Sequence, residues 1–119
     1  MDADTFPAFA RHFREAAPYI GRLRGKTLVI GIAGSLLDTG TFRPIAADLA
    51  LLAALGIRLV LVYGSRSQIS AACDQAGIQT RYHRNRRITT PEILEIAKQV
   101  CGRLAADITA ALTVGLPQA

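Results

Sequence analysis

Two short, continuously apolar segments, each ending at a glycine, constrain the fold of this chain more than any other feature. Residues 27–33 (TLVIGIA) precede Gly34, and residues 58–63 (RLVLVY) precede Gly64. Apolar runs without alternation are typical of parallel strands that are buried on both faces. We therefore expect two parallel strands, which require a crossover connection rather than a tight turn.

Helical patterns follow each of these strands. Apolar residues recur at helical spacing over residues 45–55, and we expect Thr41 as the N-cap of this helix and Pro44 in its first turn. After the second strand, Ser67 is expected to cap a shorter helix that a glycine ends. Strand, helix, strand and helix in this order predict a parallel βαβα unit with a right-handed crossover.

The N-terminal part of the chain predicts a separate helix over residues 5–17. Asp4 or Thr5 can cap it, and Pro18 is expected to kink or interrupt it. Its spacing places three aromatic side chains on one face: Phe6, Phe9 and Phe13. This face needs a partner, which is either the core of the same chain or another subunit.

The C-terminal part predicts a hairpin or extended loop over residues 78–88 and then a long helix. Residues 89–92 (TTPE) match a capping box with proline in the first turn. The helix extends over residues 91–113, about 33 Å at 1.5 Å per residue. One apolar row comprises Ile93, Ala97, Val100, Leu104, Ile108 and Ala111, and a second lies beside it: Leu94, Cys101, Ala105 and Leu112. This wide stripe exceeds what two strands are expected to cover.

Composition limits the class of protein. A chain of 119 residues holds one domain, and 50% hydrophobic with 19% charged residues excludes intrinsic disorder. No apolar run reaches the about 18 residues of a membrane span, and the acidic start lacks the basic region of a secretory signal. Cys73 and Cys101 lie far apart within helical patterns, which favours reduced core thiols. We expect a cytoplasmic protein without a membrane partner.

The glycines after the two strands mark the candidate ligand site. Ligands of open α/β sheets bind at the carboxyl ends of the strands, where Gly34 and Gly64 lie. The second turn is the better anion site because Ser65, Arg66 and Ser67 add donors beside a helix start. Neither turn matches a dinucleotide fingerprint or a P-loop. Taken alone, an ordinary preference of such turns for glycine and serine explains them better than any specific ligand.

An arginine-rich stretch, Arg81 to Arg87, is the second candidate site. Solvated charge is its usual explanation, and nucleic acid is disfavoured because no recognised binding motif is present. A small acidic ligand is better motivated because one guanidinium can fork two hydrogen bonds to a carboxylate. His12 and His83 have no evident nucleophile or metal partner. We therefore assign no catalytic residue and no metal site.

A series of short stretches resembles a known family in one collinear order. They are residues 18–20 (PYI), 24–27 (RGKT), 51–52 (LL), 55–60 (LGIRLV), 62–64 (VYG), 68–69 (QI), 82–83 (YH) and 87–89 (RIT). Together they resemble bacterial N-acetylglutamate synthase, specifically the start of its amino-acid-kinase-like domain. The resemblance extends over residues 13–112.

The resemblance implies an α/β fold, namely part of a three-layer α/β/α amino-acid-kinase-like domain. The full synthase transfers an acetyl group from acetyl-CoA to L-glutamate in arginine biosynthesis, through a separate acetyltransferase domain that nothing here resembles. Residues 1–24 would be a helical arm, and residues 25–119 the N-terminal half of the kinase-like domain. The sequence is shorter than a full domain of this kind, so we expect a truncated or split product.

Site residues carry over from the family one by one. Related kinases have a lysine where this chain has Gly31, so phosphoryl transfer is not expected. Arg87 matches an arginine that binds an acylglutamate carboxylate, and Arg66 fits a synthase turn in which Ser65 departs from the usual residue. Tyr19 matches a position near bound L-arginine. The expected ligand-binding set is Gly34, Gly64, Arg66, Arg87 and Tyr19, with no cofactor in this chain.

The resemblance also implies partners. The long helix would form a homodimer and the N-terminal helix a higher assembly, with L-arginine as effector and a separate acetyltransferase chain as a further partner. The expected oligomer contacts are Phe6, Phe9, Phe13, Ile93, Ala97, Val100, Leu104 and Ile108. The expected function is thus a catalytically silent segment for oligomerisation and arginine regulation. The alternatives are an anion-binding or assembly module that uses Arg81 to Arg87, and a residual N-acetylglutamate kinase.

Overall fold

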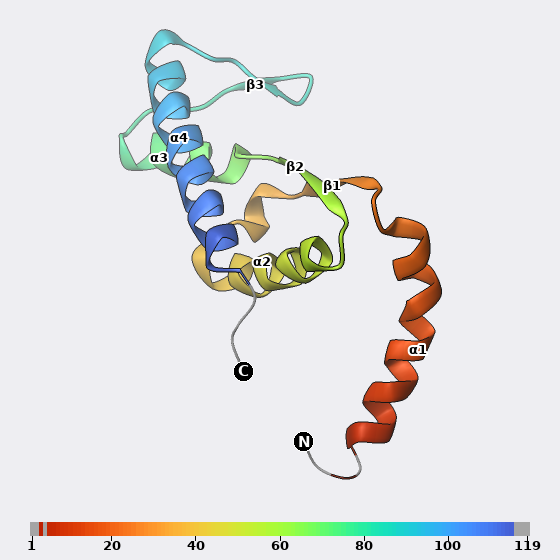
Figure 1. Ribbon diagram of the computed structural model, residues 1–119. Coiled ribbons are helices and arrows are strands. Elements are labelled where there is room, and N and C mark those ends of the chain that lie inside the picture. The colour runs from red at the N-terminus through yellow and green to blue at the C-terminus, as the bar shows by residue number, and fades with distance from the viewer. Residues whose placement is uncertain (1–2, 4, 116–119) are drawn as a thin grey trace.

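The computed structural model describes residue 3 and residues 5–115 of the chain (Figure 1). It confirms the predicted α/β class, with a parallel strand pair, a hairpin and a long last helix. The elements in chain order are α1 (Thr5–Leu23), β1 (Thr27–Ile32), the 3-10 helix η1 (Gly34–Leu36), α2 (Thr39–Ala54), β2 (Arg58–Tyr63), α3 (Arg66–Gln75), β3 (Tyr82–His83), β4 (Arg86–Arg87) and α4 (Pro91–Val114).

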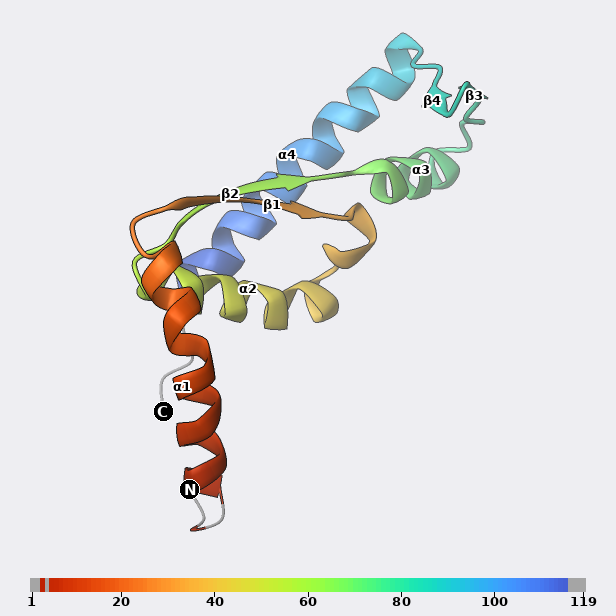
Figure 2. The same cartoon turned by 90° about the vertical axis from the view of Figure 1, so that its right-hand side faces the viewer.

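The centre of the molecule is the predicted parallel pair of strands. β1 and β2 pair in register, with Val29 opposite Val60 and Gly31 opposite Val62. α2 connects them as the crossover helix and lies along one face of the pair (Figure 2). Gly56 follows α2 with a φ of 87°, a left-handed conformation that glycine adopts without steric cost. The βαβα order predicted from the glycine-punctuated apolar runs is therefore confirmed.

The two faces of this sheet differ in burial, which corrects one prediction. Burial alternates along both strands, so only one face is covered. On the other face, hereafter the open face, Val29, Val60 and Val62 are 69%, 47% and 56% exposed. The continuous apolar runs predicted burial on both faces, and this was wrong for the described chain. The described residues supply helices to one face only.

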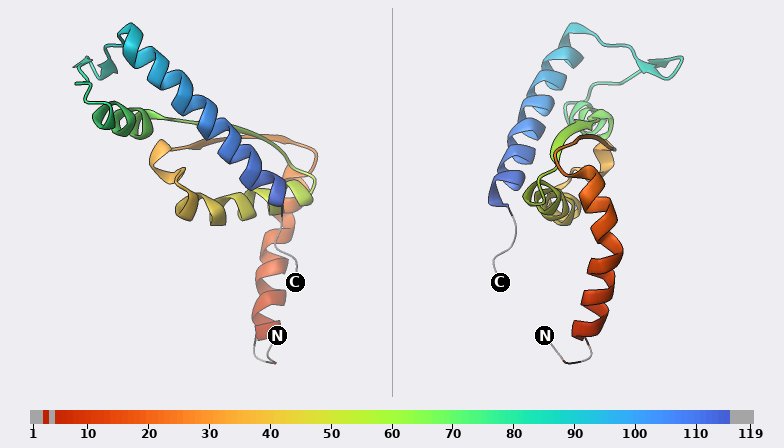
Figure 3. Two further views of the ribbon diagram at one scale, coloured as in Figure 1. Left: turned by 90° about the vertical axis from the view of Figure 1, so that its left-hand side faces the viewer. Right: turned by 45° about the vertical axis from the view of Figure 1, so that its right-hand side comes forward.

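The core lies on the covered face, between the sheet and the helices α2 and α4. α4 crosses the strands obliquely with α2 beside it (Figure 3, left). The buried cluster comprises Ile32, Leu37, Phe42, Ala46, Leu49, Val100, Leu104 and Ile108, with Ile30, Leu59, Leu61 and Tyr63 of the strands packed against it. Ile93 at the start of α4 is also buried, at 2% exposure.

α4 therefore uses its first apolar row inside the chain. Four of the expected oligomer contacts, Ile93, Val100, Leu104 and Ile108, are buried, and Ala97 is half-buried. Val100, Leu104 and Ile108 are not free to contact a second copy, because they belong to the core cluster with residues of the sheet and α2. In the second row, Leu94 is 46% exposed and Cys101 and Ala105 are also exposed, whereas Leu112 packs partly against the core. A dimer through α4 remains a prediction, and it would have to use this second row.

α1 is a single helix that extends away from the rest of the chain (Figures 1 and 2). It continues through Pro18 to Leu23, so of the expected kink or interruption at Pro18 the interruption was wrong. None of its side chains is buried, and its three phenylalanines are 52–62% exposed. Phe9 and Phe13 contact each other, with ring centroids 6.0 Å apart. The proposed cap Asp4 lies outside the described residues.

The start of α2 differs from the prediction. Asp38, not Thr41, is the N-cap, and its Oδ1 accepts a hydrogen bond of 3.1 Å from the backbone N–H of Thr41. Hydrogen bonding with the Thr41 side chain first, and then with the Thr41 backbone N–H, favours the ionised form and holds the pKa of Asp38 below its usual range. Pro44 consequently lies in the second turn of the helix. The N-cap therefore lies three residues earlier in the chain than expected.

The starts of α3 and α4 are each shifted by a residue or two. Ser65 rather than Ser67 is the N-cap of α3, and its side chain makes no capping bond. Thr90 caps α4 by accepting a hydrogen bond of 3.3 Å from the N–H of Ile93, so the capping box expected over residues 89–92 is displaced. Pro91 is the first residue of the helix, where its missing N–H costs no hydrogen bond.

The two cysteines differ in burial. Both thiols are free, but only Cys73 belongs to the core, because Cys101 is exposed. The expectation of two core thiols was therefore wrong for Cys101, which lies on the second row of α4. Across residues 3 and 5–115, no helix combines the length and the apolar character that a membrane crossing requires.

Candidate functional site

The two glycine turns meet at the carboxyl ends of β1 and β2, as predicted. A Cβ atom placed on Gly34 would lie 2.6 Å from the carbonyl oxygen of Gly64, well inside van der Waals contact. The Gln68 side-chain amide also donates a hydrogen bond to the carbonyl oxygen of Gly34, which ties α3 to the first turn. Ser67 in turn donates to the Gln68 Oε1 atom at 2.9 Å. Glycine at position 34 is thus required by the close approach of two backbones.

The β3–β4 hairpin brings the arginine-rich stretch back to the start of α3. β3 and β4 pair antiparallel, and the two residues between them, Arg84 and Asn85, have φ values of 47° and 65°. Two successive left-handed residues form the turn that suits the twist of a two-residue hairpin. The Nη2 atom of Arg66 donates a hydrogen bond of 3.3 Å to the Asn85 Oδ1 atom, so the turn is fixed to α3.

Two guanidinium groups converge on one tyrosine ring at this point. The Cζ atoms of Arg66 and Arg87 lie 4.6 and 5.1 Å from the centroid of Tyr82. These distances are within the range of cation–π attraction. The Tyr82 hydroxyl lies 3.1 Å from the Ser70 Oγ atom. That hydrogen bond first, and then the neighbouring arginines, lower the pKa of Tyr82 from its ordinary value.

The two terminal nitrogen atoms of the Arg87 guanidinium differ in their hydrogen bonding. Its Nη2 atom donates to the backbone oxygen of Arg66 at 3.1 Å and to the Ser70 Oγ atom at 3.0 Å. Its Nη1 atom is buried and has no hydrogen-bond partner among the described residues. A buried donor without an acceptor is costly, so an anionic oxygen at this position would be stabilising.

A cavity of about 260 Å³ opens beside this cluster. Its lining residues are Ser65, Arg66, Ile69, Tyr82, Asn85 and Arg87. The lining has guanidinium and hydroxyl groups and no carboxylate, which is chemistry suited to a small anion or an acidic ligand. The charge of the two arginines and the hydroxyl groups around them would bind a carboxylate or a phosphate.

The structure separates the predicted site residues into two groups. Gly34 and Gly64 meet at the strand ends, and Arg66 and Arg87 meet around Tyr82. Of the arginine-rich stretch, only Arg87 is half-buried, while its other arginines are exposed. Tyr19 is 64% exposed on α1, and this helix lies away from the β3–β4 hairpin (Figures 1 and 2). Within this chain, Tyr19 does not contribute to the cavity.

Sequence reasoning missed four residues that shape the site: Gln68, Ser70, Tyr82 and Asn85. Asn85 had a detectable signal, because an Arg-Asn pair between short polar strands is compatible with a two-residue turn that needs positive φ. Ser70 had none, since its role depends on the hairpin lying over α3. Gln68 was noted only as part of the family resemblance.

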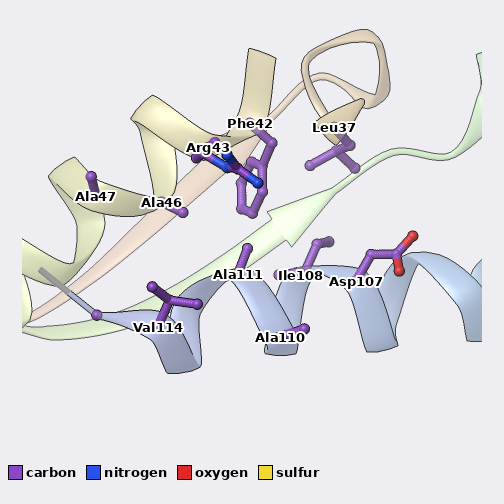
Figure 4. A pocket seen from close by; sticks show the side chains of 11 residues that line it. Leu37, Phe42, Arg43, Ala46, Ala47, Asp107, Ile108, Ala110, Ala111 and Val114 are labelled. Atoms are coloured by element: carbon purple, nitrogen blue, oxygen red, sulfur yellow. The ribbon is translucent and has the colours of Figure 1, made fainter. Parts of the chain in front are cut away.

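A larger, apolar cavity of about 520 Å³ lies between α2 and the end of α4 (Figure 4). Side chains of Phe42, Ala46, Ile108 and Ala111 point into it from the two helices. Arg43 and Asp107 are its only charged lining residues. It therefore resembles a gap in the core more than a polar ligand site. In the described part of the chain, no group of three His, Cys, Asp or Glu residues could hold a metal ion.

These observations define the class of protein first. The chain has a parallel strand pair joined by a crossover helix, with glycine turns at the carboxyl ends of the strands. This arrangement is typical of α/β proteins with an open sheet. A profile of the amino acid kinase family matches residues 26–118 of the chain. The chain belongs to this family.

The most informative relatives are enzymes with a longer chain. The amino-acid acetyltransferase of Aeromonas salmonicida is 47% identical over 110 residues, which are 92% of this chain and 25% of the relative. The amino-acid acetyltransferase of Shewanella oneidensis is 49% identical over 104 residues, 87% of this chain and 23% of the relative. The chain thus spans about a quarter of the length of the curated relatives it matches.

Solved structures give the same result. N-acetylglutamate synthase from Neisseria gonorrhoeae, complexed with coenzyme A and L-arginine, superimposes with a TM-score of 0.81 and 43% identity over 92% of this chain and 26% of that one. The same synthase complexed with coenzyme A and N-acetyl-glutamate gives a TM-score of 0.79 and 45% identity over 88% and 25%. The resemblance to the kinase-like start of N-acetylglutamate synthase is therefore confirmed.

Proposed function

We propose that this chain is the N-terminal, kinase-like segment of an N-acetylglutamate synthase and serves assembly and arginine regulation rather than chemistry. The observation that carries the proposal is the superposition on a synthase with a TM-score of 0.81 and 43% identity over 92% of this chain. In this proposal acetyl-CoA is the substrate of the complete enzyme, no cofactor binds this segment, and the protein acts in the cytoplasm.

Position 31 supports a segment without phosphoryl transfer. Gly31 lies on the open face of the sheet near the carboxyl end of β1. A Cβ atom built there would meet nothing within 4 Å, so a longer side chain has room and the glycine is not sterically required. A glycine at this position supplies no cation for a phosphoryl group. A coupled assay with ATP and N-acetyl-L-glutamate is expected to show no ADP release, and steady release would contradict the proposal.

The cluster of Arg66, Tyr82 and Arg87 supports binding of an amino-acid carboxylate. Arg87 presents a buried Nη1 donor without a partner among the described residues, beside a cavity of about 260 Å³. Titration of the chain with N-acetyl-L-glutamate by calorimetry is expected to show binding that Arg87→Ala weakens at least tenfold. Arg84→Ala is the matched control, because Arg84 lies in the same hairpin and is exposed. Equal losses from both variants would point to non-specific charge.

The regulatory part of the proposal requires the rest of a synthase. The chain would be mixed with the remaining three quarters of the Neisseria gonorrhoeae synthase, and acetyl transfer to glutamate would be measured with and without L-arginine. We expect the arginine response to be larger when the chain is present. An identical response with and without the chain would contradict a regulatory role.

Assembly is the other proposed role, and it has two surfaces. The phenylalanines of α1 are exposed on an arm that packs on nothing else in the described chain, and the second row of α4 exposes Leu94 and Cys101. A homodimer through α4 and a higher assembly through α1 would cover both. Light scattering over a concentration series tests this, since a monomer at all concentrations would contradict it.

A second candidate function is an anion-binding or assembly module. The observation in its favour is the exposure of Arg81, Arg84 and Arg86 on one hairpin of a chain with net charge +5. Retention on nucleic acid that falls steeply with salt would favour this function. Binding of N-acetyl-L-glutamate through Arg87 would instead favour the first proposal.

A further inference from the structure

The Arg87 guanidinium, the central group of the candidate site, is held by two acceptors on α3. Its Nη2 atom donates to the backbone oxygen of Arg66 at 3.1 Å and to the Ser70 Oγ atom at 3.0 Å. Arg66 and Ser70 lie about one helical turn apart, on the same face of α3. A terminal guanidinium nitrogen carries two N–H groups, so both N–H groups of Nη2 are used. Because the guanidinium is planar, these two bonds fix the plane of the whole group.

Of these two acceptors, only Ser70 depends on the residue type. The carbonyl oxygen of residue 66 is present whatever side chain stands there. The Ser70 hydroxyl is the one side-chain acceptor that Nη2 has among the described residues. The orientation of Arg87 in the cavity wall is therefore decided by a residue that does not itself line the cavity.

The Ser70 hydroxyl is in turn held by Tyr82. The two oxygen atoms lie 3.1 Å apart, and a hydroxyl that accepts a bond from Arg87 keeps its own proton for a second bond. The ring of Tyr82 lies against the same guanidinium, with its centroid 5.1 Å from the Arg87 Cζ atom. Arg87, Ser70 and Tyr82 thus form a closed network that joins β4, α3 and β3 and leaves the serine hydroxyl few alternative positions.

The acceptor at position 70 is neutral, which matters for the charge of the site. Among residues 3 and 5–115, no carboxylate forms an ion pair with Arg87, and its Nη1 atom has no hydrogen-bond partner. A serine hydroxyl orients the guanidinium without compensating its positive charge. The charge and the Nη1 donors therefore stay available to an acidic ligand, for which charge-assisted hydrogen bonds are the stronger kind.

We propose that Ser70 is a positioning residue: it holds the Arg87 guanidinium in one orientation, with the Nη1 donors and the full charge left for a ligand carboxylate. Ser70 acts through Arg87 rather than on the ligand. The inference rests on the proposed function for its ligand, N-acetyl-L-glutamate, but the orientation of Arg87 can be measured without any ligand.

The first measurement is nuclear magnetic resonance of the isotope-labelled 119-residue chain without ligand. Fixed hydrogen bonds slow the rotation of a guanidinium group, so its Nη protons give separate signals. We expect separate Arg87 signals, identified by their loss in Arg87→Ala, in the unchanged chain and in Ser70→Thr, which keeps the hydroxyl. In Ser70→Ala they should merge. Alanine is the best helix former, so this change leaves α3 folded.

Gln75→Ala is the matched control. Gln75 is the last residue of the same helix, is exposed and does not line the cavity. The change also replaces a neutral polar side chain by alanine, so a general effect on α3 would appear in both variants. The Arg87 signals should stay separate in Gln75→Ala.

The second measurement is calorimetric titration with N-acetyl-L-glutamate. Ser70→Ala should weaken binding about fivefold, because Arg87 loses one hydrogen bond that orients it. Ser70→Thr should bind within about twofold of the unchanged chain, since the hydroxyl remains. A role of Ser70 in helix stability alone would not predict recovery by threonine, which is a poorer helix former than alanine.

Each outcome decides the proposal. Merged signals and weaker binding in Ser70→Ala, with both restored in Ser70→Thr, support the positioning role. Unchanged signals in Ser70→Ala, equal merging in Gln75→Ala, or merged signals already in the unchanged chain overturn it. Equal loss of binding in Ser70→Thr and Ser70→Ala also overturns it. If Ser70 controls the signals but N-acetyl-L-glutamate does not bind, the orientation of Arg87 stands and the carboxylate ligand of the proposed function is wrong.

Discussion

α1 and α4 are both long helices with a row of apolar side chains, yet only α4 lies against the sheet. The row of α4 is buried, with Leu104 and Ile108 at 7% and 6% exposure, whereas the phenylalanines of α1 are more than half exposed. Both helices have apolar residues at helical spacing, and α1 is the more strongly amphipathic of the two. The difference teaches that periodicity identifies the side of a helix that needs a partner, while the chain connections decide whether the same molecule provides one.

The largest expected effect comes from placing a charge in the buried row of α4. Leu104→Asp should lower the free energy of unfolding by about 3 kcal/mol or more, because a carboxylate would lose its hydration among apolar side chains. Urea denaturation followed by circular dichroism measures this. Ala105→Asp, one residue further along and exposed, is the control and should cost less than about 1 kcal/mol, which is the difference in helix propensity.

This result would also separate two interpretations of α4. If its first row were a subunit contact, Leu104→Asp would reduce the molecular mass and leave a folded monomer. The structure predicts unfolding instead. A stable, folded Leu104→Asp variant would show that α4 does not pack in the core.

A smaller effect is expected at the start of α4. Thr90→Ala removes the side-chain oxygen that caps the Ile93 N–H and should cost about 1 kcal/mol. Thr89→Ala is the control, because Thr89 precedes the cap and is equally exposed. Thermal unfolding of the two variants, measured in parallel, would test whether Thr90 is the cap. A larger loss of stability from Thr89→Ala would instead support the capping box expected over residues 89–92.

The smallest effect on stability is expected in α1. The double variant Phe9→Ala and Phe13→Ala should change the free energy of unfolding by less than about 0.5 kcal/mol, because neither ring packs on the core. By contrast, the Ile108→Ala substitution in the buried row of α4 should lower the free energy of unfolding by about 3 kcal/mol. Any higher assembly should lose mass in the double variant while a dimer stays intact. A strongly destabilised double variant would mean that α1 packs on its own chain.

The order of elements could be predicted because strong local signals mark it. The bounds of β2 and the length of α4 match the expectation closely, since glycines follow both strands and the end of α2, and Pro91 begins α4. Glycine and proline act through the backbone of the residue itself, so their effect does not depend on distant contacts. The parallel pairing then follows from the crossover length.

Burial, caps and the course of α1 could not be predicted to the same degree. Both strands of the sheet are apolar on both sides, which predicts two covered faces, but coverage depends on structure beyond a single strand. The N-caps at Asp38 and Thr90 each had a neighbouring competitor of nearly equal propensity. Pro18 lies within α1 without ending it, against the local preference for a break.

The candidate site was predicted in its parts and not as a whole. Gly34, Gly64, Arg66 and Arg87 were expected, and the strand topology explains why the two glycines meet. Tyr82 and Ser70 were not expected, because their hydrogen bond forms only when the hairpin lies over α3. Tyr19 was expected near bound L-arginine, and that role stays a prediction, because the residue lies on α1 and does not line the cavity beside Arg66 and Arg87.

The close approach at Gly34 restricts how this protein can change over evolution. Even alanine at position 34 would force the first turn away from the carbonyl of Gly64. The neighbouring residues of the second turn, such as Ser65 and Arg66, meet no such restriction. The first turn must therefore keep a residue without a side chain for as long as the two strands stay paired, whereas Ser65 and Arg66 of the second turn already carry side chains.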